Sequence, residues 1–177
     1  AAIFDIVDSV QLEDVLLKTK DRPGVTYIRT IRKKAVGVYG PGSQFEIGRA
    51  NVLRDGTDVT IIACGIMVAE ALKAAKILEE QGISAAVIDI VTIKPIDEET
   101  VLEYAGKTGA VVTAENANIV GGLGSAVAEV LSRKLPTRMG FVGVNDLFGE
   151  VGDEDYLKER FELTAGKIVN VVKDIIK

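Results

Sequence analysis

Residues 58–130 decide the fold of this chain, and they contain DVTIIACG (58–65), SAAVIDIVTIKPIDEE (84–99), GAVVTAE (109–115) and NANIVGGLGSAVAEV (116–130). The first three stretches each open with a short apolar run rich in Val, Ile and Ala, which is typical of strands buried on both faces of a parallel sheet. An alanine-rich helical segment lies between the first and second stretches, and a short helical segment precedes the third. Strands that alternate with helices predict a three-layer αβα fold around a mostly parallel, twisted sheet of about five strands.

The sheet is expected to carry one antiparallel strand at its edge. The segments IGRANVLR (47–54) and DVTIIAC (58–64) flank Asp55-Gly56, and an Asp-Gly pair between apolar runs is a signal for a hairpin. Further strands and helices are expected from MGFVGV (139–144) and from apolar residues at helical spacing near the C-terminus. Asp97, Asp153 and Thr164 are the expected N-caps of three helices.

Composition narrows the classes of protein. The chain has 177 residues, 47% of them hydrophobic, and a formal net charge of -5, which argues against a nucleic-acid-binding surface. No apolar run approaches the roughly 20 residues that cross a bilayer, so we expect no membrane partner. A single cysteine, Cys64, rules out an internal disulfide and favours a cytoplasmic location. Histidine is absent, which removes every His-dependent triad.

The domain organisation is predicted from the turn-rich segment in the first third of the chain. Residues 1–34 contain one helical segment and two strand-like runs, too little to bury their own faces, and are interpreted as the tail of a neighbouring domain. Residues 35–45 have the Gly, Pro and Ser content of a linker. Residues 46–177 hold the α/β pattern and are predicted to form the second domain.

The glycine-rich loop after the third strand is a first candidate site. Gly121, Gly122 and Gly124 precede a helix, whose N-terminal amides can hold a phosphate. Val127 stands where a dinucleotide fingerprint needs a third small residue, so tight packing or a subunit contact is the competing interpretation. Glu115 follows the third strand at the edge where α/β proteins bind ligands, and it is either an acid/base or a hydrogen-bond acceptor for the loop.

A second set of candidates consists of charged residues. Arg29 and Arg32, which lie at the end of a strand-like run, are candidates for binding a phosphate, with a solvated basic strand end as the alternative. Residues three apart on an extended chain face opposite sides, so we expect one of the two arginines in any given site. The acidic residues between Asp146 and Asp155 match no calcium-binding loop, and helix capping explains them more simply.

Three tracts carry a resemblance to a known family: IKPID (93–97), the glutamate followed by GGLGSAVAE (115 and 121–129), and FGEVG (148–152). With the segments around them they resemble the carboxy-terminal portion of transketolases, and split or short transketolases of bacteria and archaea are most similar. Residues 1–34 resemble the end of the family's pyrimidine-binding domain, and residues 46–177 its C-terminal domain. The alternatives are a deoxyxylulose-phosphate synthase, the β subunit of a 2-oxoacid dehydrogenase, or a non-catalytic assembly module.

The resemblance implies an enzyme of the pentose phosphate pathway that transfers two-carbon ketol units between sugar phosphates. It implies thiamine diphosphate with Mg²⁺ or Ca²⁺ as cofactors of the complete enzyme. It also implies that the chain forms a homo-oligomer, which in this family is a dimer, or binds a partner chain that carries the diphosphate-binding domain, or both. The family's Gly-Asp-Gly motif, its activating glutamate tract and its catalytic histidines are absent, so this chain alone is expected to be inactive and to bind no cofactor. The stretch PGVTYIRTIRKK (23–34) resembles the corresponding strand of the family. This resemblance places Arg32 where the family has an arginine that binds the sugar phosphate, and Arg29 at a second, less constant arginine. Asn116 stands where members often carry a histidine, so Glu115, Gly121, Gly122 and Gly124 are assigned to a loop or interface site.

Overall fold

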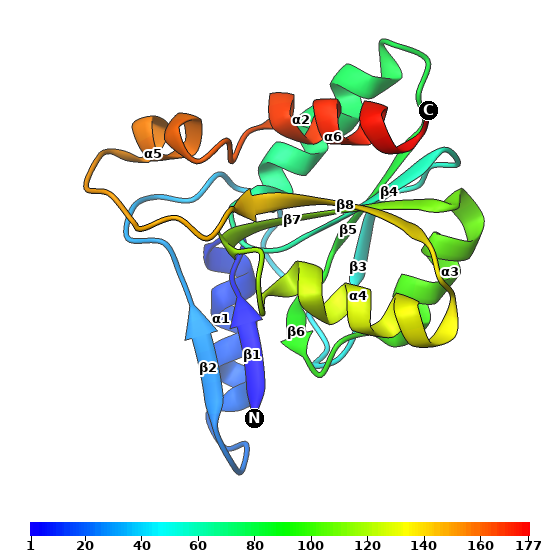
Figure 1. Ribbon diagram of the computed structural model, residues 1–177. Helices are drawn as coiled ribbons and strands as arrows, with labels where there is room; N and C mark the ends of the chain where they lie inside the picture. Colours follow the sequence, from blue (N-terminus) through cyan, green and yellow to red (C-terminus); the bar gives the residue numbers. More distant parts are fainter.

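The computed structural model describes residues 1–177, and its centre is a five-stranded sheet between two layers of helices (Figure 1). The strand order is β3-β5-β4-β7-β8, in which β3 runs antiparallel to β5 and every other neighbouring pair is parallel. The strands are β3 (Asn51–Arg54), β4 (Val59–Ala63), β5 (Ala85–Asp89), β7 (Ala110–Asn118) and β8 (Arg138–Val144). The predicted mostly parallel sheet of about five strands with one antiparallel edge strand is confirmed.

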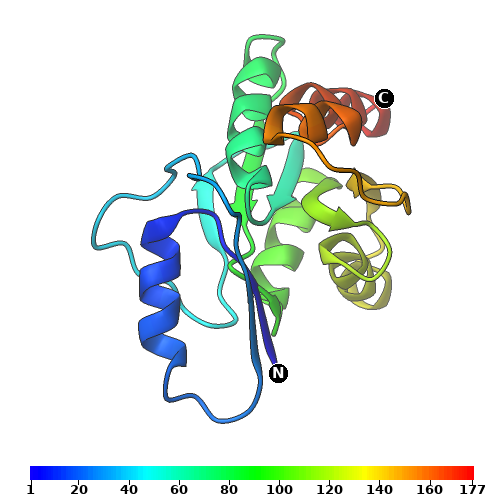
Figure 2. The same ribbon diagram turned by 90° about the vertical axis from the view of Figure 1, so that its left-hand side faces the viewer.

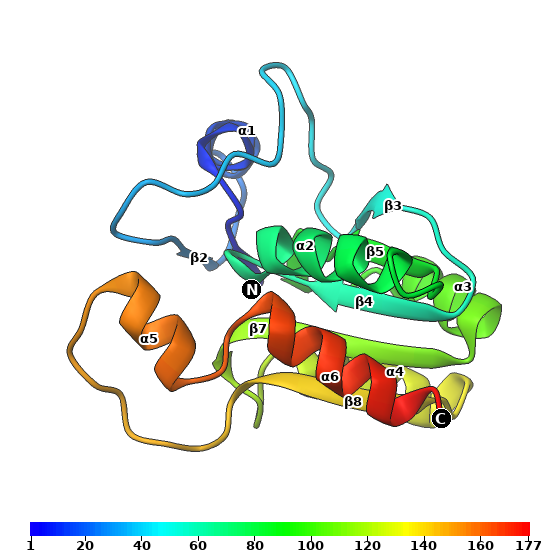
Figure 3. The ribbon, with the colours of Figure 1, turned by 90° about the horizontal axis from the view of Figure 1, so that it is seen from above.

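Helices cover both faces of this sheet. Helices α2 (Met67–Glu79) and α6 (Ala165–Ile175) pack on one face, and α3 (Glu98–Thr108) and α4 (Leu123–Lys134) pack on the other (Figures 1 and 3). Every residue of β4 and β5 is buried because both faces of these strands meet a helical layer. Two separate apolar cores result, one beneath α2 and α6 and one beneath α3 and α4.

The expected helix caps are in place. Asp97 accepts a hydrogen bond from Thr100 N at the start of α3, and Thr164 accepts one from Lys167 N at the start of α6. Asp153 caps the short helix α5 (Glu154–Arg160) in the same way. None of the six helices has the combination of length and apolar character that a transmembrane helix requires.

The predicted hairpin at Asp55-Gly56 is wrong, although the edge strand that it suggested exists. Strand β3 pairs with β5 rather than with β4. The connection crosses the amino end of β5, where the amides of Thr57 and Asp58 both donate to the carbonyl of Ser84. A Cβ at position 56 would lie 2.2 Å from the amide nitrogen of Ala86, so glycine is needed here for a close backbone crossing and not for a two-residue turn.

The N-terminal part, the blue segment in Figure 2, contributes to a second, smaller sheet with the order β2-β1-β6 (Figure 1). It contains β1 (Ala2–Asp5), α1 (Ser9–Thr19), β2 (Thr26–Arg29) and β6 (Thr92–Lys94). Strand β6 follows β5 directly in the chain and pairs antiparallel with β1. Phe45 and Val91, from further along the chain, complete a small apolar core with side chains of the N-terminal part that include Phe4 and Val15.

Candidate functional site

Buried polar side chains gather where the two sheets meet, at the carboxyl ends of several strands. Asp5 ends β1, Cys64 follows β4, Asp89 ends β5 and Glu115 lies within β7. Each of these four residues is at most 5% exposed. Buried carboxylates need partners, so their contacts show what this edge can bind.

The carboxylate of Glu115 is held by the first turn of α4. Its two oxygens accept hydrogen bonds from the amides of Leu123 and Gly124, each at 2.8 Å. Burial raises the pKa of Glu115, and the two amides and the charge of Arg29 offset part of this effect. The helix N-terminus therefore already holds an anion, which is a carboxylate of the same chain.

The glycines of the loop before α4 are explained by this packing. A Cβ at Gly122 would lie 1.9 Å from Oε2 of Glu115, and a Cβ at Gly124 would lie 2.7 Å from the ring of Phe141. Gly121 has a φ of 80°, which side chains rarely adopt. The geometry supports tight packing at Gly122 and Gly124 and a turn with positive φ at Gly121, and Glu115 is the hydrogen-bond acceptor for the loop.

Arg29, at the end of β2, forms an ion pair with Asp5 on the neighbouring strand β1. Nε of Arg29 donates to Oδ1 of Asp5 at 3.1 Å, and Nη2 donates to Oδ2 of the same carboxylate. Burial alone would lower the pKa of the Arg29 guanidinium, but the hydrogen bonds and the charge of Asp5 raise it. The thiol of Cys64 also donates to Oδ2 of Asp5, at 3.3 Å. Arg29 is thus fixed in a two-pronged contact with a buried carboxylate.

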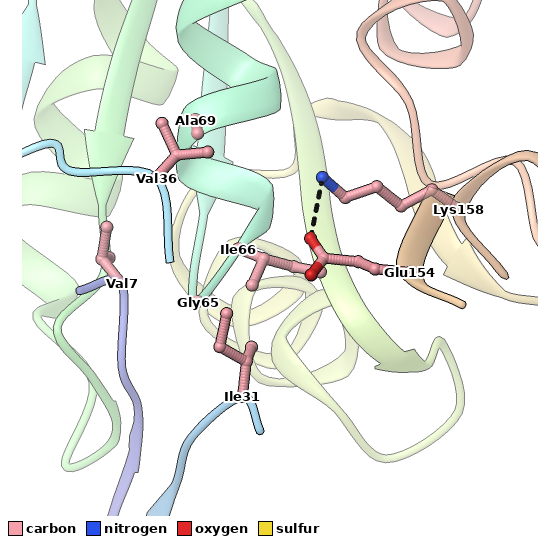
Figure 4. Close-up of a pocket in the computed structure, with 8 residues that line it drawn as sticks. All are labelled: Val7, Ile31, Val36, Gly65, Ile66, Ala69, Glu154 and Lys158. Atoms are coloured by element: carbon pink, nitrogen blue, oxygen red, sulfur yellow. Dashed lines mark ion pairs between the residues drawn. The ribbon is translucent and has the colours of Figure 1, made fainter. Parts of the chain in front are cut away.

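Arg32 lies three residues further on, in an exposed bend, and makes no hydrogen bond or ion pair. Its neighbour Ile31 lines a small pocket between the N-terminal part, the start of α2 and helix α5. Figure 4 shows the residues around this pocket, where Lys158 forms an ion pair with Glu154 at 3.3 Å. The guanidinium of Arg32 is therefore available for an anion, and its role in binding a sugar phosphate stays a prediction.

Asp89, which was not among the candidates predicted from the sequence, anchors the N-terminal part to the main sheet. Its Oδ2 accepts hydrogen bonds from Nε2 of Gln11 at 2.7 Å and from the hydroxyl of Tyr39 at 2.6 Å. Its Oδ1 is buried and accepts no hydrogen bond. Burial raises the pKa of Asp89 to about 7, against the effect of the two donors. The side chains of three separate segments meet at this one carboxyl group.

Of the five acidic residues between Asp146 and Asp155, all but Asp155 have structural partners. Glu150 accepts from the hydroxyl of Tyr156 and from Nε of Arg160, and Asp153 caps α5. No group of three or more His, Cys, Asp or Glu residues is arranged to hold a metal ion. Cys64 is buried, and burial raises the pKa of its thiol well above the ordinary value.

A diphosphate-containing cofactor does not fit at the glycine-rich helix start before α4. The glycine-rich helix start that could hold a diphosphate is filled by Glu115. A bound diphosphate there would have to displace a buried carboxylate from the same two amides. The carboxyl edge thus provides packing and fixed charge, and Arg32, in the bend after β2, is an exposed cation without an ion-pair partner.

The fold and the site define a three-layer α/β domain that is joined to a smaller sheet through buried carboxylates. Residues 48–168 match the family described as "Transketolase, C-terminal domain", and the chain belongs to this family. This confirms the resemblance that the three sequence tracts carry.

Two curated relatives and one solved structure illustrate the similarity. The "6-deoxy-6-sulfo-D-fructose transketolase subunit SqwH" of Clostridium sp. (strain MSTE9) is 51% identical over 98% of this chain and 54% of its own length. The "Putative transketolase C-terminal section" of Methanocaldococcus jannaschii is 39% identical over 96% of this chain and 54% of its length. The structure described as "Split gene transketolase, inactive beta4 tetramer" has a TM-score of 0.96 and 47% identity, over 99% of this chain and 57% of that chain. The chain thus spans about half the length of the curated relatives it matches.

Proposed function

We propose that this chain is the C-terminal portion of a thiamine-diphosphate-dependent enzyme that transfers two-carbon ketol units between sugars. The family match supports this proposal, together with a relative named as a transketolase subunit at 51% identity. In the complete enzyme thiamine diphosphate and its Mg²⁺ or Ca²⁺ would be held by a domain outside residues 1–177. The cofactor would supply the carbanion chemistry of ketol transfer. The proposed location is the cytoplasm.

The role proposed for this chain within that enzyme is assembly and substrate orientation. The buried hydrogen bonds from Gln11 and Tyr39 to Asp89 connect the N-terminal part to the main sheet. They fix the relative position of the two sheets, which favours binding of a partner to both. The chain would associate with further copies of itself, with a chain that carries the thiamine diphosphate domain, or with both. A solved structure with 47% identity is described as a β4 tetramer, which supports self-association of such chains.

We infer that this chain binds the anionic group of the sugar substrate, and that Arg32 is the residue that contacts it. Arg32 is exposed and unpaired beside the carboxyl edge, and a guanidinium presents two parallel donors to a tetrahedral oxyanion. A sugar phosphate of the pentose phosphate pathway is the first candidate. A sulfonated sugar is the second, because the 51% identical relative is named for 6-deoxy-6-sulfo-D-fructose.

The experiment that tests the function compares the chain alone with the chain mixed with a partner that carries the thiamine diphosphate domain. We expect calorimetric titration of the chain alone with thiamine diphosphate and Mg²⁺ to give no binding, because Glu115 fills its one glycine-rich helix start. The mixture should bind the cofactor and transfer ketol units. Micromolar binding of thiamine diphosphate by the chain alone would contradict the proposal that another domain holds the cofactor. A mixture that associates but stays inactive would favour a non-catalytic assembly module.

The role of Arg32 is tested by Arg32→Ala in the reconstituted enzyme. Affinity for a phosphorylated or sulfonated sugar should fall by roughly 1.5–3 kcal/mol for each charge-assisted hydrogen bond lost. An uncharged acceptor of the same length should lose little, and cofactor affinity should not change. Steady-state kinetics with phosphorylated, sulfonated and neutral acceptors measure the contrast and identify the preferred anion. Equal losses for all three acceptors would show that Arg32 is structural.

A further inference from the structure

Arg32 lies on a loop that contains no helix or strand. We call residues 30–37 the basic loop, because Arg32, Lys33 and Lys34 are exposed on it and form no ion pair. No backbone hydrogen bond involves a residue of the basic loop. The course of the loop is therefore set by the residues that precede and follow it and by its apolar contacts.

Both ends of the basic loop are held by buried carboxylates. Arg29, directly before the loop, donates to both oxygens of Asp5. Directly after the loop, the amides of Val38 and Tyr39 both donate to Oδ2 of Asp8, each at 2.8 Å. Asp5 and Asp8 are each 5% exposed, and they lie at the end of β1 and directly before α1. One short connection in the chain thus holds the loop at both ends.

Between its ends the basic loop contacts the main domain through two apolar side chains. Ile31 and Val36 line the same pocket, beside Gly65, Ile66 and Ala69 at the start of α2 (Figure 4). The three cations lie between these two positions in the sequence. Because apolar contacts are not directional, the hydrogen bonds at the ends of the loop decide its conformation.

The two oxygens of Asp8 have different partners. Oδ1 accepts the amide of Gln11 at 3.0 Å and caps α1, whereas Oδ2 accepts the two amides at the end of the basic loop. A helix cap needs one oxygen, which serine or asparagine supplies as well as aspartate does. The second oxygen of Asp8 therefore serves the loop, and its negative charge strengthens both hydrogen bonds.

We propose that Asp8 is a positioning residue, which fixes the basic loop so that Arg32 meets the anionic group of the sugar. The inference rests on the proposed role of Arg32 and adds to it the residue that acts through Arg32. Without the two hydrogen bonds to Asp8 the loop takes up several conformations. The apparent affinity for the anion then falls with the fraction of molecules in which the guanidinium is correctly placed.

The first test uses the chain alone and measures cleavage by trypsin within the basic loop, which mass spectrometry identifies. Asp8→Asn keeps a capping oxygen, but its NH₂ group cannot accept the amides of Val38 and Tyr39. Cleavage in the loop should become about tenfold faster, because the loss of two hydrogen bonds raises the population of open conformations. Asp8→Ser also keeps a capping oxygen and should give the same result, so the test does not depend on one variant.

Asp97 provides the matched control. It caps α3 through Oδ1, and its Oδ2 accepts the amide of Ala50 at 2.9 Å, so its two oxygens are used in the same way as those of Asp8. Asp97→Asn should leave cleavage in the basic loop unchanged. Equal cleavage rates in the Asp8 and Asp97 variants would overturn the proposal.

The second test measures KM and kcat of the reconstituted enzyme with a pentose phosphate and with the free pentose. Asp8→Asn should raise KM for the phosphorylated acceptor about tenfold, change kcat less than about twofold and leave KM for the free pentose unchanged. A merely structural defect would affect both acceptors. In combination with Arg32→Ala, Asp8→Asn should have no further effect, because no guanidinium remains to be positioned. Additive losses in the double variant would overturn the proposal.

The two tests separate this inference from the proposed function. Suppose that Arg32→Ala raises KM for the pentose phosphate but Asp8→Asn changes only the cleavage rate. The carboxylate then holds the loop without positioning Arg32, so the inference is overturned and the proposed function stands. If Arg32→Ala itself leaves KM unchanged, the proposed role of Arg32 is wrong, and the inference fails with it.

Discussion

Replacement of Arg29 by alanine is expected to lower the free energy of unfolding by about 3 kcal/mol, far more than replacement of Arg32. Arg29 donates two hydrogen bonds to the buried carboxylate of Asp5, whose side chain is 7% exposed. Removal of the guanidinium leaves that carboxylate in a poorly solvated site without its cation. The Arg29 side chain is 30% exposed, so water partly compensates, and the effect should lie at the lower end of the range for broken buried pairs.

Urea unfolding of the two variants measures this difference. Arg32→Ala should change stability by no more than about 0.5 kcal/mol, because Arg32 is exposed and unpaired. Asp5→Asn provides the internal control. Combined with Arg29→Ala it should cost clearly less than the sum of the single changes, because a neutral amide no longer needs the cation. Additive losses, or a mild effect of Arg29→Ala, would show that the pair contributes little.

The unfolding measurements on the two variants distinguish a structural role of Arg29 from a binding role of Arg32. The alternation of side chains along a strand suggested that only one of them faces a given site. The structure places Arg29 against Asp5 and leaves Arg32 exposed. A large stability loss for Arg29 together with a pure affinity loss for Arg32 would identify Arg29 as the residue that holds the strand ends together and Arg32 as the ligand.

Most of the fold could be predicted because the local patterns are strong. The runs at β4 and β5 are apolar throughout, and the structure buries them on both faces. The caps of α3, α5 and α6 follow from single Asp or Thr residues before helical segments. The pairing of β3 could not be predicted, because Asp55-Gly56 also suits a crossing over the end of β5. The short strand β6 was hidden in the same apolar run as β5.

The candidate site was only half predictable. The rule that ligands lie at the carboxyl ends of strands singled out Glu115, and the same rule applied to AIFD and AAVID would have found Asp5 and Asp89. Their partners could not be found in this way. Gln11 lies 78 residues from Asp89 in the chain, and Tyr39 lies 50 residues from it in a segment without regular structure. Contacts over such separations are set by how the two sheets pack and not by local sequence.

The contact at Asp89 should make the stability of this chain depend on pH. The pKa of Asp89 is raised from its ordinary value of 3.8 to about 7, first by burial and further by the negative charge of Asp5, whereas the donors Tyr39 and Gln11 oppose the change. A raised pKa in the folded state means that folding favours the protonated carboxyl group. Its contribution is therefore complete below about pH 4 and is lost as the pH rises through 7. The full loss corresponds to about 4 kcal/mol, of which about 3 kcal/mol falls between pH 5 and pH 8.

Asp89→Asn tests this expectation, because an amide of the same shape does not titrate. We expect the difference in unfolding free energy between the unchanged chain and Asp89→Asn to shift by about 3 kcal/mol in favour of the variant from pH 5 to pH 8. Tyr39→Phe, which removes a donor that favours the ionised carboxylate, should make the loss at high pH larger. Urea unfolding at several pH values gives these differences, and hydrogen exchange should place the weakening at pH 8 in α1 and residues 35–45, which Gln11 and Tyr39 connect to Asp89. A constant difference between the unchanged chain and Asp89→Asn over this range would show that Asp89 stays ionised in the folded chain.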